Sequence, residues 1–463
     1  MVPPLTQKIL YQPEAARGIQ VYGAGRPRPT VRPAYTDESL AKALREGVDP
    51  TGRPLAAPMP RYALTDSDMA ALIAYLKTLS ASTSPGDDGK TMHLATIVTE
   101  GVAPERRKAL LDILQAYAHD WNADIRHQTE RGKFTLDTMY ESYRHWDLHV
   151  WELKGPRGTW ASQLDKYYRE QPVFAVLSGI GNGSWRPIHQ FCEQMELPCL
   201  YPVTDEPPVT ESDFYSIYFS KGPATEAEVL AKHLKDKGVS QSARIVQVFR
   251  SDDVGTATAA AFRKAMEAEG FGNVKDRSLR PQDRIPPGFW SGLMEQEQPV
   301  VMALWLDPDA WQSVGGQKLG AKALQSVFVS GSLQGGRPIA VPEALRDKLF
   351  LLYPYDLPEN RTKRLARMQA WLRMKKIAPG NDLDQARAYF AVLSVSESIK
   401  HMLDNHYRDY LVERLENMAN SPMPSPFPRL SLGTGQRYAS KGAYVLQVAA
   451  GGKLKPVSDW IVP

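Results

Sequence analysis

The chain has 463 residues, of which 43% are hydrophobic and 23% are charged, and this composition supports two to four domains with proper cores. The formal net charge of +4, without a basic block, argues against a nucleic-acid or membrane-surface role. The best apolar run, PVVMALWL at 299–306, has only the length of a strand, and MVPPLTQKIL does not have the pattern of a signal peptide. We therefore expect neither a nucleic-acid partner nor membrane insertion.

The first 80 residues are rich in proline and glycine and contain two predicted helices. TDESLAKALREG at 36–47 opens with capping residues and ends at Gly47, a residue typical of a left-handed C-cap. TDSDMAALIAYLKTL at 65–79 begins with a predicted capping box of Thr65 and Asp68, and its apolar residues recur on one helix face. The polar stretch 81–91 is predicted to be a linker.

From residue 92 onward, predicted strands alternate with predicted helices. The expected strands are listed here: 93–100, 146–153, 172–179, 198–203, 243–249, 299–306, 326–331 and 348–355. The expected helices between them are 104–121, 160–171, 184–196, 226–238 and 255–270. Such alternation predicts an α/β fold of parallel sheets covered by helices on both faces, and its restart after residue 222 indicates two lobes.

Three separated segments carry a likeness to a known family: PVFAVLSGIGNGSWRPIHQFCEQMELPCLYPVTDEPP at 172–208, VFRSDDVGTATAAAFRKAMEAEG at 248–270, and RLSLGTGQRYASKGAYVLQVAAGGKLKPVSDWIVP at 429–463. Together they resemble type I periplasmic solute-binding proteins, the branched-chain amino-acid binding family. The resemblance covers about residues 92–463. It implies two doubly wound lobes that close on a small solute, with lobe 1 at about 92–220 plus part of the C-terminal region and lobe 2 at about 222–350. It also implies a periplasmic location, an ABC permease as partner, and no catalysis.

The resemblance and the strand ends together predict the ligand-binding residues. In open parallel sheets the loops at the carboxyl ends of the strands meet at one crevice, and SGIGNGSW at 178–185 is such a loop. The expected ligand-binding residues are Ser178, Asn182, Gly183, Ser184, Trp185, Val203, Thr204, Asp205, Asp252, Trp305, Asp307 and Ser332. Core packing is the alternative role for Trp185 and Trp305, and helix capping is the alternative for Asp252 and Asp307.

Departures from the family pattern bear on the identity of the solute. By ungapped comparison, Asn182 takes a serine position and Asp205 a threonine position, and Ser332 stands where an acidic residue normally pairs with an ammonium group. A buried ammonium needs such a partner. We therefore expect a small solute that is not an α-amino acid, with the two tryptophans as flat walls suited to an aromatic or aliphatic group.

The segment GVDPTGRPLAAPMPRYALTDSDMAALIAYLKTLS at 47–80 and VPPL at 2–5 resemble the C-terminal part of class I cytochromes c. This resemblance implies that residues 1–80 form a small, mostly helical cytochrome c-like domain with Met59 as an axial ligand of haem iron. It further implies haem c as cofactor, and a redox partner or an associated dehydrogenase. The attachment motif CxxCH is missing, so haem c cannot be attached to this chain. We expect a truncated start, and the alternative is a haem-free solute-binding or sensor protein with a vestigial N-terminal cap.

The remaining chemical signals are weak. The two cysteines, Cys192 and Cys199, are expected to be partly buried thiols, with a disulfide in an oxidising compartment as the alternative. No GxSxG, HExxH, P-loop or dinucleotide motif occurs in a suitable context, so an enzyme on an α/β scaffold is the least favoured class. The pair His145 and His149 could bind a metal only together with partners that the sequence does not identify.

Overall fold

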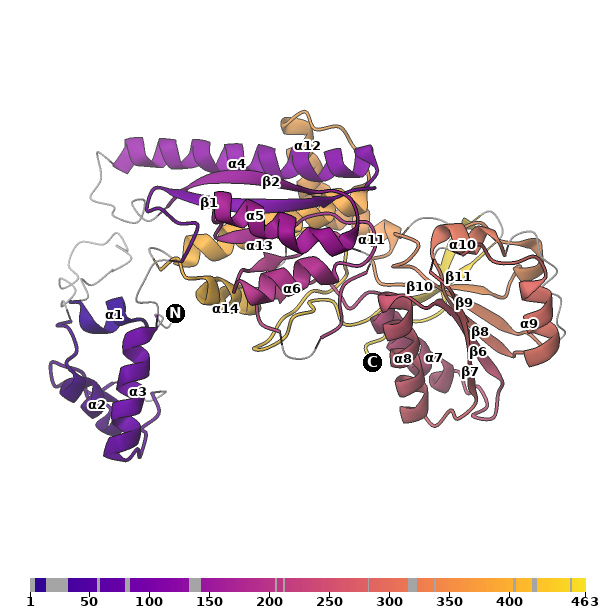
Figure 1. Cartoon of the computed structure of the whole chain (residues 1–463), viewed down its shortest axis with the longest axis horizontal. Coiled ribbons are helices and arrows are strands. Elements are labelled where there is room, and N and C mark those ends of the chain that lie inside the picture. The colour runs from indigo at the N-terminus through magenta and orange to yellow at the C-terminus, as the bar shows by residue number, and fades with distance from the viewer. Residues whose placement is uncertain are drawn as a thin grey trace. The chain divides into compact units, whose positions relative to one another are not determined.

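The computed structural model describes residues 5–13, 32–55, 59–79, 84–132, 143–204, 206–210, 213–281, 283–314, 323–336, 339–402, 405–418, 423–449 and 452–463. The chain divides into two compact units (Figure 1). The first unit comprises Met1–Pro85 with Asp404–Tyr410, and the second comprises Gly86–Leu403 with Leu411–Pro463. Among the described residues, none of the helices combines the length and the apolar character needed to cross a membrane.

The described residues of the first unit form the helices α1 (Gln7–Tyr11), α2 (Asp37–Glu46) and α3 (Asp66–Thr78). They enclose a small apolar core of Leu10, Leu40, Leu44, Met69, Ile73 and Leu76. The predicted ends of α2 are confirmed: Thr36 and Ser39 form a capping box, and Gly47 adopts the left-handed conformation with φ of 70°. This geometry carries little strain because glycine has no Cβ.

The start of α3 differs in one respect from the prediction. The hydroxyl of Thr65 accepts the amide of Asp68 at 3.2 Å, as expected for an N-cap. The Asp68 carboxylate, however, accepts the Thr65 hydroxyl at 2.7 Å. The predicted capping box is therefore a single cap by Thr65, because the Asp68 carboxylate accepts the Thr65 hydroxyl and not a backbone amide.

Lobe 1 of the second unit is built on a five-stranded sheet with the order β2-β1-β3-β4-β5. All its pairings are parallel. Its strands are β1 (Thr91–Thr99), β2 (His145–Leu153), β3 (Ala175–Leu177), β4 (Cys199–Leu200) and β5 (Ser216–Ile217). Its early helices are α4 (Pro104–Gly132), α5 (Trp160–Glu170) and α6 (Arg186–Gln194).

Helices cover both faces of the lobe 1 sheet. On one face, Ala95 and Ile97 of β1 pack with Leu164 of α5 and Ile188 of α6 in a buried apolar cluster. On the other face, α4 lies against β2, and the later helix α13 (Asp382–Met402) lies against α4 and β3. Helices on both faces explain why β1 is buried at every position from Leu94 to Thr99 and does not alternate between buried and exposed residues.

Lobe 2 is built on a seven-stranded sheet with the order β12-β11-β10-β9-β8-β6-β7. Its strands are β6 (Ile245–Arg250), β7 (Val274–Leu279), β8 (Val301–Trp305), β9 (Ser326–Ser330), β10 (Leu349–Tyr353), β11 (Tyr444–Val448) and β12 (Leu454–Pro456). The pairings from β7 to β10 are parallel, and β11 and β12 add on antiparallel. The helices are α7 (Pro223–Asp236), α8 (Asp253–Ala268), α9 (Phe289–Glu297) and α10 (Pro308–Gln312).

The chain passes between the lobes three times, after β5, after β10 and before β11. The second passage returns it to lobe 1, where α11 (Pro358–Arg364), α12 (Ala366–Met374), α13 and α14 (Arg408–Met418) follow. Two of the passages lie side by side, because Tyr218 and Tyr438 form a parallel bridge and their rings stack with centroids 5.7 Å apart. The connection pattern is the one expected for two hinged α/β lobes.

The two cysteines differ from the sequence expectation of two thiols. Cys192 near the end of α6 and Cys199 at the start of β4 form a disulfide, with Cα atoms 6.2 Å apart. The helix turns back toward the sheet within seven residues and thereby brings the two side chains together. The structure therefore contains the disulfide, which was the alternative expected for an oxidising compartment.

Candidate functional site

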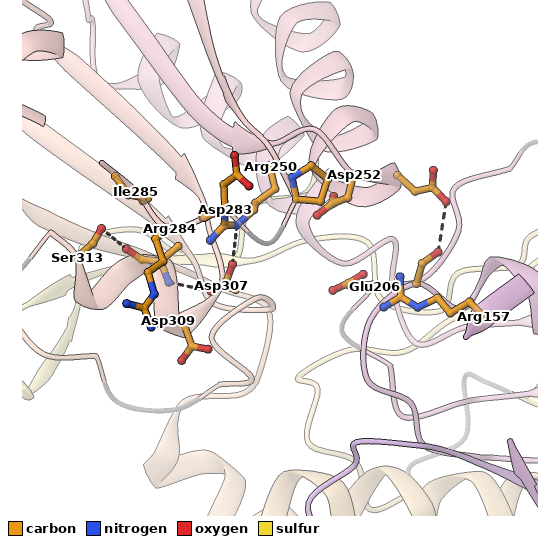
Figure 2. A pocket seen from close by; sticks show the side chains of 14 residues that line it. Arg157, Glu206, Arg250, Asp252, Asp283, Arg284, Ile285, Asp307, Asp309 and Ser313 are labelled. Atoms are coloured by element: carbon orange, nitrogen blue, oxygen red, sulfur yellow. Dashed lines mark hydrogen bonds and ion pairs between the residues drawn. The ribbon is translucent and has the colours of Figure 1, made fainter. Parts of the chain in front are cut away.

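A cleft of about 860 Å³ opens between the two lobes at the carboxyl ends of their strands. Arg157, Ser184 and Glu206 line it from lobe 1, and the remaining lining residues come from lobe 2. Figure 2 shows Arg157 and Glu206 on one side of the cleft and the Arg250–Asp307 pair on the other. The volume is that of a site for a small molecule.

The wall from lobe 2 is fixed by helix caps and by one arginine. Asp252 follows β6 and accepts the amide of Gly255 at 2.7 Å, which caps α8. Asp307 follows β8 and accepts the amide of Ala310 at 2.8 Å, which caps α10. Arg250, the last residue of β6, donates from Nε to the Asp307 carboxylate at 3.1 Å. The capping roles weighed for Asp252 and Asp307 are thus present, and both residues also line the cleft.

Arg250 also orders the loop after β7. Its NH1 donates to the carbonyl of Arg280 at 3.0 Å and to the carbonyl of Asp283 at 2.7 Å. The side chain is 14% exposed, so its contacts lie largely out of solvent. One guanidinium therefore holds three strand ends of lobe 2 in a fixed arrangement.

The lip from lobe 1 is the loop SGIGNGSW. Ser178 is buried, and its hydroxyl donates to the Tyr201 carbonyl at 3.2 Å. Asn182 is anchored by its backbone amide, which donates to the Thr99 hydroxyl at 2.9 Å. Gly183 has φ of 80°, a backbone conformation that favours glycine because it has no Cβ, and the end of the Arg157 side chain lies over the position that a Cβ would take.

The two lobes touch at the start of α6 and of α8. Arg186 donates from Nε to the Asp253 carboxylate at 3.1 Å. Ser184 donates to the same carboxylate oxygen at 3.5 Å. Because Arg186 and Asp253 are about half exposed, this ion pair contributes little to stability and is easily opened. It is suited to a contact that forms and breaks as the lobes move.

Carboxylates outnumber guanidinium groups in the cleft. The lining includes six acidic residues, Glu206, Asp252, Asp253, Asp283, Asp307 and Asp309, and three basic residues, Arg157, Arg250 and Arg284. The lining apolar residues are small in number, namely Pro281, Ile285 and Ala310. The cleft therefore presents a polar surface with an excess of negative charge.

The structure places three of the predicted ligand residues in this cleft, Ser184, Asp252 and Asp307. Thr204 and Ser332 line a second, small cavity of about 10 Å³ near the lobe connections. Asn182 and Gly183 lie on the lip, Ser178 and Val203 are buried in lobe 1, and Asp205 lies outside the described residues.

The two predicted tryptophan walls lie inside the lobes. Trp185 is 1% exposed in the core of lobe 1, beneath the lip. Trp305 is also 1% exposed, packs at a ring-centroid distance of 5.6 Å from Phe262, and donates to the Gln247 side-chain carbonyl at 2.9 Å. Neither ring is among the residues that line the cleft. Both tryptophans therefore pack in the cores of their lobes, which was the alternative role considered for them.

Several lining residues were not foreseen, chiefly Arg157, Glu206, Asp283, Arg284, Asp309 and Ser313. Arg250 had a usable signal, since it directly precedes the acidic pair of the RSDD segment at a strand end. Glu226 was also missed: it is fully buried, accepts the amide of Ser332 at 2.8 Å and accepts the Ser330 hydroxyl. The Glu226 carboxylate thus hydrogen-bonds to the loop SGSLQ at 330–334, but it lies in the buried interior of lobe 2 and does not line the cleft.

The family model for periplasmic binding proteins matches residues 154–453, which is more than half of the chain. The chain belongs to the periplasmic binding protein family. The family is that of solute-binding proteins of ABC-type systems, and it implies a periplasmic or extracellular location. No curated protein matches the chain.

Solved structures support the same fold for this periplasmic binding protein. A fatty acid ABC transporter substrate-binding protein from Thermomonospora curvata has a TM-score of 0.56 at 17% identity, covering 82% of this chain and 95% of its own. A solute-binding protein from R. palustris in complex with benzoate has a TM-score of 0.57 at 13% identity, with 81% and 98% covered. A branched-chain amino acid ABC transporter structure from Thermus thermophilus with bound valine has a TM-score of 0.57 at 11% identity, with 81% and 97% covered.

The first unit does not carry the residues that a covalent haem requires. Both cysteines of the chain are joined in the disulfide of the second unit, so neither can form a thioether bond to haem. Met59 lies on the segment between α2 and α3 and is 36% exposed. No comparison supports a cytochrome domain, and the residues present do not fit the cofactor expected from the sequence.

Proposed function

We propose that this periplasmic binding protein captures a small, polar, positively charged solute in the cleft between its lobes, for ABC-type transport or for sensing. The observation that carries the proposal is the lining of the cleft, which holds six carboxylates and three guanidinium groups in a space of about 860 Å³. A cleft with this surplus attracts cations and ligands that donate several hydrogen bonds.

The position of the cleft supports capture by closure. Its residues come from loops at the carboxyl ends of strands in both lobes, and the Arg186–Asp253 pair shows that the lobes contact one another here. A solute that touches both walls makes more contacts in the closed arrangement than in the open one, and it therefore stabilises the closed arrangement. Solute binding therefore couples to lobe closure, which a permease or a sensor partner can recognise.

The charge surplus changes the expectation about α-amino acids. That expectation depended on the loss of one acidic partner at Ser332, whereas the cleft offers carboxylates from both lobes, including Glu206 and Asp253. We propose that the positive charge of the solute is the recognised feature. Amino acids accordingly belong in the test beside amines and guanidinium compounds.

The test is isothermal titration calorimetry on the full chain with three sets of probes: diamines and guanidinium compounds, α-amino acids, and aliphatic or aromatic carboxylates. We expect one cationic probe to bind at one site per chain. Glu206→Gln, which neutralises a lining carboxylate, should weaken binding about tenfold, a change of about 1.4 kcal/mol. Asp276→Asn is the matched control, since this carboxylate of β7 pairs with Arg263 and does not line the cleft.

Tight binding of a carboxylate probe with no cationic binding would contradict the proposed charge preference. Equal binding by the wild type and Glu206→Gln would show that the solute does not use this wall. Failure of every probe, together with no effect of any probe on the thermal unfolding midpoint, would count against solute capture by this cleft.

A second proposal concerns the first unit, which we infer to be the C-terminal part of a cytochrome c-like domain. The observation that favours it is the partly exposed Met59 on a Pro-Met-Pro segment that leads to α3, together with Tyr75, which is 60% exposed on that helix. Its test is haem staining of the natural gene product and reading of the coding sequence before codon 1. An in-frame CxxCH and a positive stain would support electron transfer with a redox partner or dehydrogenase. A negative stain would support a haem-free cap.

A further inference from the structure

Two histidines and an aspartate converge on the edge of the lobe 1 sheet. His93 lies on β1, and Asp147 and His149 lie on β2, which is the edge strand of the sheet. In the parallel register His93 pairs with Asp147, and His149 follows two residues later. Because side chains alternate along a strand, all three project from the same face. The fold thus brings together donors that are more than 50 residues apart in the sequence.

The distances between the donor atoms are those of a metal-ligand set. His93 Nδ1 and His149 Nε2 are 3.1 Å apart. The Asp147 carboxylate oxygen lies 3.5 Å from His93 Nδ1 and 3.5 Å from His149 Nε2. Tetrahedral zinc with bonds of about 2.0–2.1 Å places its ligand atoms about 3.3–3.4 Å apart. One zinc ion therefore fits among these three atoms with little movement of the side chains.

A second carboxylate supports one of the histidines. The far nitrogen of His93, Nε2, faces the Asp88 carboxylate at 3.8 Å. Asp88 is itself fixed, because its other oxygen accepts the amides of Lys90 at 2.8 Å and Thr91 at 2.7 Å. A carboxylate that hydrogen-bonds to a ligating histidine orients the ring and raises its basicity as a ligand, and Asp88 could do so after a small approach from 3.8 Å. This arrangement favours Nδ1 of His93 as the donor that points to the metal.

The exposure of the three residues suits a metal site that is open to solvent. The side chains of His93 and His149 are 17% and 27% exposed, and that of Asp147 is 55% exposed. The two histidine rings are thus partly buried, while an ion and a water molecule can reach the site from the side of the Asp147 carboxylate. Two imidazoles and one carboxylate form a donor set that zinc commonly takes, with the fourth position left for water.

We propose that His93, Asp147 and His149 bind one Zn²⁺ ion at the β2 edge of the lobe 1 sheet. The site is separate from the solute cleft, because it lies toward the start of β1 whereas the cleft lies at the carboxyl ends of the strands. The ion joins the edge strand β2 to its neighbour β1 at a point where β2 has no strand on its other side. Zinc therefore stabilises the edge of the sheet that carries lobe 1.

The test uses the full chain, first stripped with a chelator and then titrated with Zn²⁺ by calorimetry. We expect one ion per chain, and a thermal unfolding midpoint that rises with zinc concentration because the ion binds the folded state. Replacing zinc with Co²⁺ should give the visible absorption of a tetrahedral Co²⁺ site. His93→Gln and His149→Gln should each weaken binding by 100-fold or more, and Asp88→Asn by about tenfold.

His145→Gln is the matched control, since His145 lies on the same face of β2 but outside the three-residue cluster. It should leave zinc affinity unchanged. All variants are first compared without metal by circular dichroism, so that a folding defect is recognised. The proposal is overturned if the wild type binds no zinc in a saturable manner, if His145→Gln weakens binding as much as His149→Gln does, or if the Co²⁺ spectrum is octahedral and unchanged by His93→Gln.

Discussion

Replacement of His233 by leucine should remove a large part of the acid sensitivity of the second unit. His233 lies on α7, is 5% exposed, and meets the ring of Phe328 edge-on at a centroid distance of 6.0 Å. Burial, with a smaller contribution from the nearby charge of Lys237, lowers the pKa of His233 from 6.5 to about 4. The folded protein therefore keeps this imidazole neutral at a pH where the unfolded chain takes up a proton.

The sign and size of the effect follow from this difference in pKa. Above pH 6.5 both states are neutral at His233, so the residue adds no pH dependence there. As the pH falls from 6.5 toward 4, only the unfolded state binds the proton, and stability is lost. Each pKa unit corresponds to about 1.4 kcal/mol, so the loss is at most about 2 kcal/mol at pH 5 and about 3 kcal/mol at pH 4 and below.

The assay is urea unfolding at pH 7 and pH 5, followed by tryptophan fluorescence. All ten tryptophans lie after residue 120 and within the second unit, so the signal reports on that unit. Between the two pH values, the wild type should lose about 2 kcal/mol more unfolding free energy than His233→Leu. His119→Gln is the control, since the His119 side chain is 77% exposed. Equal losses for the wild type and His233→Leu would refute the reasoning.

Three further outcomes are expected. Asp252→Ala removes the cap of α8 and should lower the unfolding free energy by about 1 kcal/mol, as measured by urea unfolding; an unchanged midpoint would contradict the capping role. Reduction of the Cys192–Cys199 disulfide opens a short loop and should cost about 2 kcal/mol in the same assay, whereas no change would show that the bond does not constrain the unfolded chain. Arg186→Ala breaks a half-exposed pair with Asp253 and should change stability by less than about 1 kcal/mol, while shifting small-angle X-ray scattering of the ligand-free protein toward the open form; a large stability loss would argue against an easily opened contact.

Most strands of both lobes, and the helices up to residue 270, could be predicted because buried parallel strands have short apolar sequences between amphipathic helices. The helices after residue 270, including α13, were not predicted; α13 is buried along almost its whole length and has no clear amphipathic pattern. The strands β5 and β7 were missed for physical reasons. β5 has only two residues, and β7, VKDRSL, is a partly exposed edge strand with little apolar pattern. The antiparallel additions β11 and β12 were recognised only as a family-like tail, since nothing local in the sequence tells which strand they join.

The cleft was harder to predict than the fold. Ser184, Asp252 and Asp307, which follow strand ends, line the cleft, since topology alone brings such loops together; that they bind the solute stays a prediction. The burial of Trp305 could not be predicted, because it depends on the partner Gln247 on an adjacent strand. The Arg186–Asp253 contact depends on how two lobes face each other, which no local pattern records. The proposed zinc ligands could not be predicted for the same reason. The sequence suggested His145 with His149 because they are close along the chain, whereas the pairing of β1 with β2 brings His93 beside Asp147 and His149.

The return of the chain to lobe 1 after β10 has a consequence for biosynthesis. Helix α13 is buried along almost its whole length and packs against α4, which is made more than 250 residues earlier. During synthesis, the apolar surface of α4 and of the lobe 1 sheet that α13 covers therefore stays exposed to solvent until residue 402 has emerged. Contacts between segments so far apart in the sequence tend to form late, and the apolar surface that stays exposed until then favours aggregation of the incomplete chain.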